Sequence, residues 1–294
     1  MQRVCHAVTT KFPDLKFIGL CHEIESMRRQ LPSLMETELS NIEFRAGGLN
    51  HFSILLDAKF KNNGKDGYPL IKKNFWNYFK DLVNDHEGFE SEPGAERGVF
   101  FKIYEDFKYL PITTDSHLGE YIQWAHNVAD HDAINEFYSN YKKHCLSFHD
   151  NTRSISKFFE PEREVYERVI PIIEAIITDH EYIEAAVNIP NQNFINQLPN
   201  GIVVEVPGIV NKDGLSGIEL ENYPTPFALL LNNQVGTIEL TTQAVLNKSR
   251  HSAYLAMLVD PVVDDPKAAE RLLNTICLLY TSPSPRDQRG SGMA

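Results

Sequence analysis

A short apolar run near the amino terminus, KFIGLCHE (residues 16–23), limits the possible architectures more than any other part of the chain. Residues 16–20 are apolar apart from Lys16 and are followed at once by polar residues, which predicts a buried strand and then a loop. In folds that alternate strands and helices, functional groups often lie just past the carboxyl end of such a strand. Cys21, His22 and Glu23 are therefore the first candidates for a site.

The remaining patterns predict an α+β fold in which helices dominate. Residues 41–60 contain two strand-like runs with a break at Gly47-Gly48, and GIVVEV (residues 201–206) is a strand closed by Pro207-Gly208. Spacings of three and four residues between apolar positions predict helices over residues 3–10, 24–31, 68–83, 99–109, 131–146, 162–179, 224–232, 237–260 and 264–276. Within residues 162–179, Pro171 should kink the helix or begin a fresh turn.

Composition excludes several classes of protein. The chain has 294 residues and a net charge of −12, and it lacks a basic stripe, which argues against a nucleic-acid binder. It has no apolar run of roughly eighteen residues to span a membrane, and no signal peptide. The four cysteines are far apart and form no CxxC pair, which favours a reducing cytoplasm over a disulfide framework.

The carboxyl-terminal segment differs in character from the rest. Residues 277–294, CLLYTSPSPRDQRGSGMA, are largely polar and Pro-rich and lack periodicity. The string CLLYTSPSPRD resembles the in-frame translation of a sequencing adapter. We therefore expect an assembly artefact over residues 277–294 and leave it out of the fold prediction.

Three groups of residues carry potential chemistry. Beside the Cys-His-Glu group of residues 21–23, Asn50 and His51 follow a double glycine, and TTDSH (residues 113–117) precedes Glu120 and Tyr121. A thiolate and an imidazole from separate strands, with coordination positions left for substrate and water, would make a catalytic metal site.

Each of these residues also has a structural interpretation. A buried cysteine such as Cys21 is more often a small core residue than a ligand. His51 could be a hydrogen-bonded structural histidine, and Asp115 could cap a helix that begins near Leu118. Spacing by itself therefore leaves the metal site and the structural interpretation both open.

The paired motifs KFIGLCHE and GLNHF resemble family 4 of the glycoside hydrolases. The stretches GLNHFSILLDAKFKNNGKD, YLPITTDSHLGEYIQWA and LPNGIVVEVPGIV are similar to its α-galacturonidase and α-glucosidase branch, and the resemblance covers most of residues 2–276. It implies the carboxyl-terminal fold shared with lactate dehydrogenases, plus the last part of a Rossmann-type sheet. Residues 1–22 would then be a remnant of a dinucleotide-binding domain, and residues 23–276 a metal- and substrate-binding domain.

The resemblance also implies a function, the hydrolysis of α-glycosides such as α-galacturonides or α-glucosides. In this family NAD is thought to oxidise the C3 hydroxyl transiently, after which the C2 proton is removed and the glycosidic oxygen leaves by elimination. A divalent metal, usually Mn²⁺, acts as a Lewis acid at the sugar oxygens. The expected partner is a small carbohydrate, and family members usually assemble as homo-oligomers.

The family motifs map onto particular residues of this chain. Cys21 and His51 match the metal ligands, and His22 occupies a position near the leaving oxygen, where we expect an acid or a substrate contact. Asp115 is the candidate base for the C2 proton. Because some members use tyrosine, Tyr121 and Tyr109 stay open as alternatives.

Three further residues are candidates for substrate binding. Asn50 belongs to the GLNH motif, whereas His117 and Arg45 would meet a substrate carboxylate if the sugar is a uronic acid. The simpler interpretations are a histidine at a helix start and a surface arginine on a strand.

The chain departs from the family in one large respect. The Gly-rich dinucleotide loop, the acidic residue that grips ribose and the Asn-Pro motif are all absent. We therefore expect this chain alone to be inactive. Two other functions stay open: a metal-independent dehydrogenase of the lactate/malate type that acts on a 2-hydroxy acid, and a non-catalytic remnant that kept the fold.

Overall fold

The computed structural model describes residues 1–83, 85–86, 89–151 and 168–281 of the chain. These residues form the predicted α+β fold around a sheet whose strand order is β5-β2-β1-β7-β6, with β8 paired to β7. All the strand pairs are antiparallel. The strands are β1 (Ile42–Leu49), β2 (Phe52–Phe60), β5 (Leu110–Pro111), β6 (Tyr182–Pro190), β7 (Val203–Asn211) and β8 (Gly214–Gly217), and a separate small pair is formed by β3 (Asp85–His86) and β4 (Phe89–Glu90).

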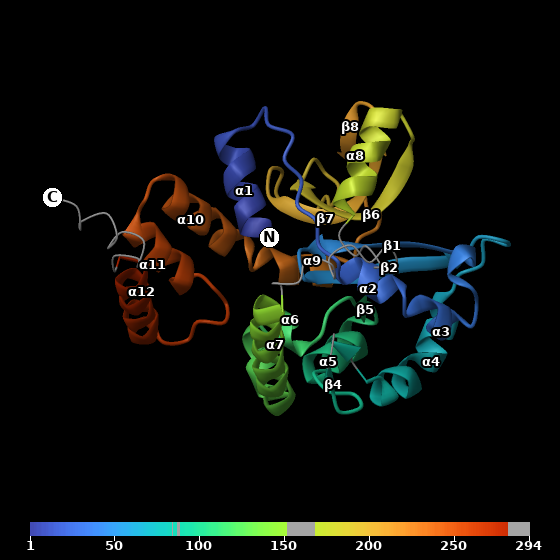
Figure 1. The fold of residues 1–294 in the computed structure, drawn as a ribbon, viewed down its shortest axis with the longest axis horizontal. Helices are drawn as coiled ribbons and strands as arrows, with labels where there is room; N and C mark the ends of the chain where they lie inside the picture. The colour runs from blue at the N-terminus through green and yellow to red at the C-terminus, as the bar shows by residue number, and fades with distance from the viewer. Residues whose placement is uncertain (84, 87–88, 152–167, 282–294) are drawn as a thin grey trace.

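Helices lie on both sides of this sheet and beyond one end of it (Figure 1). The described helices are α1 (Gln2–Lys11), α2 (Glu23–Arg28), α3 (Leu31–Met35), α4 (Tyr68–Asp81), α5 (Gly98–Phe107), α6 (Asp115–Leu118), α7 (His131–Asn151), α8 (Val169–Thr178), α9 (Thr225–Asn232), α10 (Val235–Leu246), α11 (Arg250–Leu258) and α12 (Pro266–Thr281), with short 3₁₀ turns at Leu39–Asn41 and Gln123–Asn127. In Figure 1, α4 and α5 lie on one side of the sheet, α8 lies on the other, and α10, α11 and α12 form a group beyond its end.

Most of the predicted helices are confirmed, with differences at their ends. The prediction for residues 24–31 is wrong in detail, because two short helices, α2 and α3, replace one. The stretch 237–260 is likewise divided: Lys248 has a φ of 52°, and the Ser249 side chain accepts a hydrogen bond from the backbone N–H of Ser252 to begin α11. Helix α8 begins at Val169, so Pro171 lies in a first turn, while residues 162–167 lie outside the described part of the chain.

The apolar run at residues 16–20 does not form the predicted buried strand. It makes one isolated antiparallel bridge, in which the N–H and C=O of Gly19 pair with Asn188 of β6 at 3.0 and 2.8 Å. A Cβ at Gly19 would lie 2.5 Å from the Cys5 sulfur of α1 and 3.0 Å from the Cβ of Asn188. The glycine therefore allows the close approach that places Cys21, two residues later, above the end of the sheet.

The first two strands form a hairpin whose turn differs from the prediction. The break was expected at Gly47-Gly48, but both glycines lie inside β1, and the chain reverses at Asn50 and His51 between the paired residues Leu49 and Phe52. The glycines serve packing here, since a Cβ at Gly47 would lie 2.4 Å from the carbonyl oxygen of Glu205 in β7. Gly47 thus lets β7 approach β1 closely, whereas a Cβ at Gly48 would lie 2.5 Å from the carbonyl oxygen of Phe52 in β2.

Strand β7 continues through Pro207-Gly208, where the sequence predicted its end. Proline lacks the N–H that a central strand needs, yet β6 has a register shift between Glu184 and Val187, opposite Pro207. This irregularity accommodates the missing donor, so the strand reaches Asn211. Strand β6 itself was not predicted.

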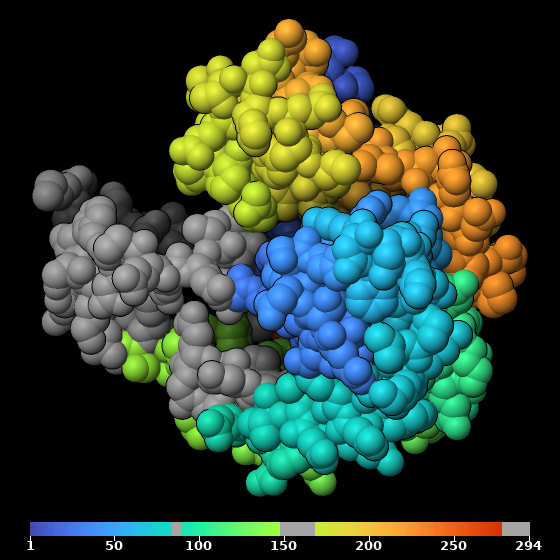
Figure 2. All heavy atoms as spheres, turned by 90° about the vertical axis from the view of Figure 1, so that its right-hand side faces the viewer, coloured from blue at the N-terminus to red at the C-terminus, as the bar shows by residue number. Residues whose placement is uncertain are grey.

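The core lies where the sheet meets the helices. Phe52, Ile54 and Leu55 of β2 and Phe75 of α4 are fully buried and belong to one core cluster. Figure 2 shows one face of this arrangement, with the β1–β2 hairpin and neighbouring segments (blue to cyan) between α8 with β6 to β8 (yellow to orange) and α4 with α5 (cyan to green). All four cysteines are free, and within the described residues no helix has the length and apolar character of a membrane span.

Candidate metal and substrate site

Two predicted ligands from distant parts of the sequence meet at one end of the sheet. Cys21 follows the Gly19 bridge, and His51 is at the tip of the β1–β2 hairpin. The Cys21 Sγ and the His51 Nε2 are 3.1 Å apart. A soft thiolate and an imidazole this close are a donor pair typical of a transition-metal site.

Two hydrogen bonds from the segment 113–121 fix the backbone of the hairpin tip. The Thr113 hydroxyl donates to the carbonyl oxygen of His51 at 2.8 Å, and the Tyr121 hydroxyl donates to the carbonyl oxygen of Asn50 at 3.1 Å. His51 itself has a φ of 65°, a left-handed conformation that costs a residue with a side chain about 1–2 kcal/mol. Such an outlier, kept in place by side chains around it, is a common feature of functional sites.

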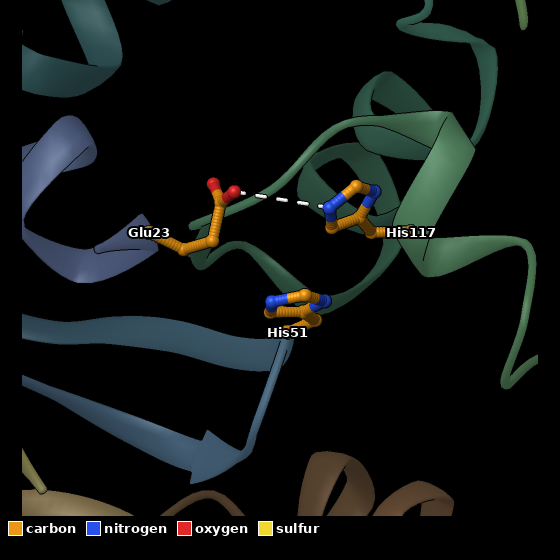
Figure 3. A group of neighbouring side chains, drawn as sticks. All are labelled: Glu23, His51 and His117. Carbon is orange, nitrogen blue, oxygen red and sulfur yellow. Dashed lines mark ion pairs between the residues drawn. The ribbon is translucent and has the colours of Figure 1, made fainter. Parts of the chain in front are cut away.

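Two further side chains complete the cluster around His51. Figure 3 shows Glu23 from α2, His51 and His117 from α6 pointing toward one another from three separate segments. Their potential ligand atoms all lie within 4.8 Å of one another. The His117 Nε2 is 3.8 Å from a Glu23 carboxylate oxygen, and the rings of His117 and His51 are 4.4 Å apart. We call Cys21, Glu23, His51 and His117 the Cys21 cluster.

The local environment keeps the two central groups neutral at pH 7. Burial raises the pKa of the Cys21 thiol to about 12, and the nearby charge of Glu205 also raises it, against the backbone N–H of Glu23 and the Asn50 amide, which lower it. Burial lowers the pKa of His51 to about 3, and the positive charge of a protonated His117 lowers it further. A divalent cation favours the thiolate and needs the unprotonated imidazole, so metal binding here would release the thiol proton.

The residues present therefore fit a divalent transition metal. One thiolate, one imidazole and the flanking Glu23 and His117 supply soft and borderline ligands at one point. Mn²⁺, Zn²⁺ and Co²⁺ all accept donors from such a set. In contrast, the Gly-rich loop that usually holds the pyrophosphate of a dinucleotide does not occur among residues 1–294.

Asp115 lies apart from this donor set and has a structural environment. It is 1% exposed, and its two carboxylate oxygens accept hydrogen bonds from the backbone N–H groups of Phe100 at 3.0 Å and Asp130 at 2.9 Å. Phe100 is in the first turn of α5, where backbone donors have no partner within the helix. Asp115 thus caps a helix, as the simpler interpretation expected, but the helix is α5 and not one that begins near Leu118. This geometry argues against Asp115 as the base.

The other predicted residues divide between the site and its surroundings. His22 directly precedes α2, with a side chain 46% exposed and its Nε2 3.4 Å from Glu23. Tyr121 stacks on Phe52 with ring centroids 5.1 Å apart, and its hydroxyl reaches the hairpin tip. Both therefore adjoin the Cys21 cluster.

Arg45 and Tyr109 are not brought to the cluster in this way. Arg45 is opposite Asp57 in the middle of the hairpin, away from its tip, and its guanidinium binds that carboxylate with an Nε–Oδ2 distance of 2.9 Å. The ring of Tyr109 instead packs edge-on to Tyr68, with the centroids 6.2 Å apart. Neither placement supports the predicted role, which was a substrate contact for Arg45 and an alternative base for Tyr109.

One residue of evident importance was missed. Glu205 of β7 is fully buried beneath the hairpin tip, where burial raises the pKa of its carboxyl group to about 7. The Asn50 amide, predicted to bind substrate, is 3% exposed and donates inward to Glu205 at 3.2 Å. The available signal was an acidic residue in the otherwise apolar strand sequence GIVVEV.

Comparison with known proteins finds glycosidases that are similar along most of this chain. The α-glucosidase of Erwinia rhapontici is 40% identical over 301 residues, which cover 94% of this chain and 64% of the relative. The α-galacturonidase of Bacillus subtilis is 24% identical and matches 95% of this chain and 66% of its own length. The chain thus spans about two thirds of these relatives.

Solved structures share the fold. A 6-phospho-α-glucosidase from gut microorganisms, determined with NAD and Mn²⁺, superposes with a TM-score of 0.66 at 19% identity and covers 96% of this chain and 65% of that one. The model of the family 4 glycosyl hydrolase C-terminal domain matches residues 46–263, more than half of the chain. The chain belongs to family 4 of the glycosyl hydrolases.

Proposed function

We propose that this chain is the metal- and substrate-binding part of an α-glycosidase that uses a divalent metal and NAD. The observation that carries the proposal is the 3.1 Å approach of the Cys21 sulfur to the His51 Nε2 at the hairpin tip. The family membership supports the same chemistry. Because the residues of this chain do not fit NAD, we assign them no step that involves it, and we propose that the chain by itself does not turn over.

Cys21 and His51 would hold the metal, with Glu23 and His117 beside it. A divalent cation held there supplies a Lewis acid that makes a bound sugar hydroxyl or carbonyl oxygen easier to deprotonate or polarise. Glu23 lies between His22 and His117, 3.4 and 3.8 Å from their Nε2 atoms. It can thus orient either imidazole toward a bound sugar.

Proton transfer falls to groups at the edge of the cluster. His22 is the exposed imidazole and can deliver a proton to a leaving oxygen from the solvent side. Tyr121 is better placed than Asp115 to take a proton, because its hydroxyl lies next to the backbone of the hairpin tip. Burial raises the pKa of Tyr121, so a nearby cation would have to stabilise its phenolate for it to act as a base.

The proposed substrate class is α-glucosides, after the α-glucosidase that is 40% identical. The second candidate is an α-galacturonide, for which His117 is the observation in favour. Its ring is partly exposed beside His51, where a protonated imidazole would attract a sugar carboxylate.

The test uses a protein that contains this chain together with a dinucleotide-binding domain. It is assayed with p-nitrophenyl α-glucoside, the α-galactoside and an α-linked galacturonide, in NAD, Mn²⁺ and a reductant. We expect α-glucoside hydrolysis that EDTA abolishes and Mn²⁺ restores. Cys21→Ser should reduce it about 100-fold or more, because a ligand matters at least as much as the groups around it.

The matched control is Cys145→Ser, which changes an exposed cysteine of α7 and should leave activity intact. Hydrolysis that survives both EDTA and Cys21→Ser would refute the metal site. Metal-independent NADH production from a 2-hydroxy acid would instead identify a dehydrogenase, and inactivity on every substrate would favour a non-catalytic remnant.

A further inference from the structure

The buried carboxyl group of Glu205 joins three strands through side chains alone. Its Oε1 accepts hydrogen bonds from the amides of Asn50 and Asn188, each at 3.2 Å, and its Oε2 lies 2.8 Å from the Ser53 hydroxyl. These partners come from the hairpin tip, from β6 and from β2. Glu205 is fully buried.

The backbone brings this carboxyl group to the hairpin tip by close packing. Gly48 pairs with Glu205 across β1 and β7, and the missing side chain of Gly47 leaves room for the carbonyl oxygen of Glu205. A larger residue at Gly47 would push β7 away. The position of Glu205 under Asn50 is therefore built into the sheet.

Asn50 connects Glu205 to the turn that carries His51. Its amide nitrogen donates a hydrogen bond to the Glu205 Oε1. Asn50 directly precedes His51 in the turn, and the His51 Nε2 is 3.1 Å from the Cys21 sulfur. One amide fixed from below therefore holds the tip that carries the imidazole beside the sulfur.

Counting protons shows which form of Glu205 satisfies every partner. The Ser53 hydroxyl has one hydrogen, yet it lies 2.9 Å from the Leu49 carbonyl oxygen and 2.8 Å from the Glu205 Oε2. If Glu205 is a neutral acid, its hydroxyl donates to Ser53, Ser53 donates to Leu49, and the Oε1 still accepts from both amides. A neutral Glu205 also places no negative charge beside a Cys21 thiolate.

We propose that Glu205 is a positioning residue of the metal site, which acts through the Asn50 amide to hold the His51 turn in ligand geometry beside the Cys21 sulfur. The inference rests on the proposed function, because it presupposes that Cys21 and His51 bind the metal. Groups that orient metal ligands typically contribute about 10–100-fold to metal affinity. Glu205 touches neither the metal nor the substrate in this role.

The experiment titrates the 294-residue chain with Co²⁺, whose bond to a thiolate gives a charge-transfer absorption band in the near ultraviolet. We expect Glu205→Leu and Asn50→Ala each to weaken Co²⁺ binding about 10–100-fold and to reduce or shift the band. The double variant should bind Co²⁺ no more weakly than the single variant with the larger loss of affinity, because both substitutions break the same connection. Glu205→Gln keeps the shape and bonds of the neutral acid and should bind Co²⁺ like the unaltered chain.

Glu184→Gln is the matched control, since this buried carboxylate of β6 binds Arg168 and Tyr182 instead of the hairpin. It should leave Co²⁺ binding unchanged, and circular dichroism verifies that each variant is folded. If Glu205→Leu does not fold, Asn50→Ala and Glu205→Gln still decide the outcome. Unaltered Co²⁺ affinity and band in Asn50→Ala, or a Glu205→Gln variant as weak as Asn50→Ala, overturns the proposal.

If the proposed metal site is wrong, the variants should give a different pattern of Co²⁺ binding. If Cys21→Ser binds Co²⁺ as tightly as the unaltered chain and the band does not depend on Cys21, the proposed metal site is wrong and the positioning role falls with it. If Cys21→Ser abolishes the band while the Glu205 and Asn50 variants keep it, only the positioning role is wrong.

Discussion

Asp115 and Glu205 are two buried carboxyl groups in regions of the molecule that serve different purposes. Asp115 is 1% exposed and Glu205 is fully buried, and burial raises the pKa of both. Asp115 accepts hydrogen bonds from the backbone, at the first turn of α5 and at Asp130. Glu205 instead meets three side chains, and one of them, Asn50, directly precedes His51, whose Nε2 is 3.1 Å from the Cys21 sulfur.

The difference shows that the partners of a buried acid indicate its role better than its burial does. Backbone donors at a helix start need an acceptor whatever the protein does, so an acid that serves them is structural. The side-chain donors around Glu205 are not required by any helix or strand, and one of them, Asn50, lies in the turn that carries His51. We therefore expect Asp115 to affect stability alone and Glu205 to affect both stability and the site.

The largest expected effect is at Asp115. Asp115→Ala leaves two buried backbone N–H groups without their acceptor, and we expect the free energy of unfolding to fall by about 4 kcal/mol, since each unpaired buried group costs about 1–3 kcal/mol. Urea unfolding measures this loss. The control, Asp106→Ala, removes an exposed acid of α5, the helix that Asp115 caps. Asp106 pairs with Lys102, and its loss should lower the free energy of unfolding by about 0.5 kcal/mol or less. A stable Asp115→Ala chain that fails to bind Co²⁺ would reverse the comparison.

The next effect is the pH dependence that Glu205 imposes. Burial raises the pKa of Glu205 from 4.5 to about 7 in the folded chain, so between these values the folded state binds more protons than the unfolded state. Stability must therefore fall as the pH rises through this window, by about 3 kcal/mol in total. Glu205→Gln cannot titrate and lacks this loss.

Urea unfolding in EDTA at pH 5 and pH 8 measures this contribution, taken as the difference between Glu205→Gln and the unaltered chain. The two proteins should have similar stability at pH 5, and the variant should be the more stable at pH 8. A difference that does not change with pH would mean that Glu205 has an ordinary pKa, and the contrast with Asp115 would then rest on hydrogen-bond partners alone.

The family resemblance predicted the pairing of the two proposed ligands better than the local sequence predicted the acids. Cys21 and His51 belong to short motifs, and the structure brings them together as expected. Asp115 has a local sequence suited to a helix cap, but the helix it caps begins seventeen residues earlier, at Gly98. A contact of this kind depends on tertiary packing, which periodicity along one segment does not contain.

The strands illustrate the same limit. Gly47 and Gly48 were predicted as a break between two strands, where glycine allows either a bend or a close approach. The position of Glu205 in β7, opposite these glycines, shows that Gly47 serves a close approach between strands. Pro207 is similar: it would end an isolated strand, and the irregularity in β6 that accommodates it lies about twenty residues away in sequence.

The smallest expected effect is at Ser53, which hydrogen-bonds Glu205 but is not part of the connection to the His51 turn. Ser53→Ala should cost about 1 kcal/mol at pH 5, because one buried hydroxyl is lost. It should also raise the pKa of Glu205 further, since a hydrogen bond to the ionised carboxylate is roughly twice as strong as one to the neutral acid. The pH at which stability falls would then move upward, which urea unfolding across pH 5 to 9 measures. A downward shift would show that Ser53 stabilises the neutral acid more than the carboxylate, and that the hydroxyl donates to Leu49 in both protonation states.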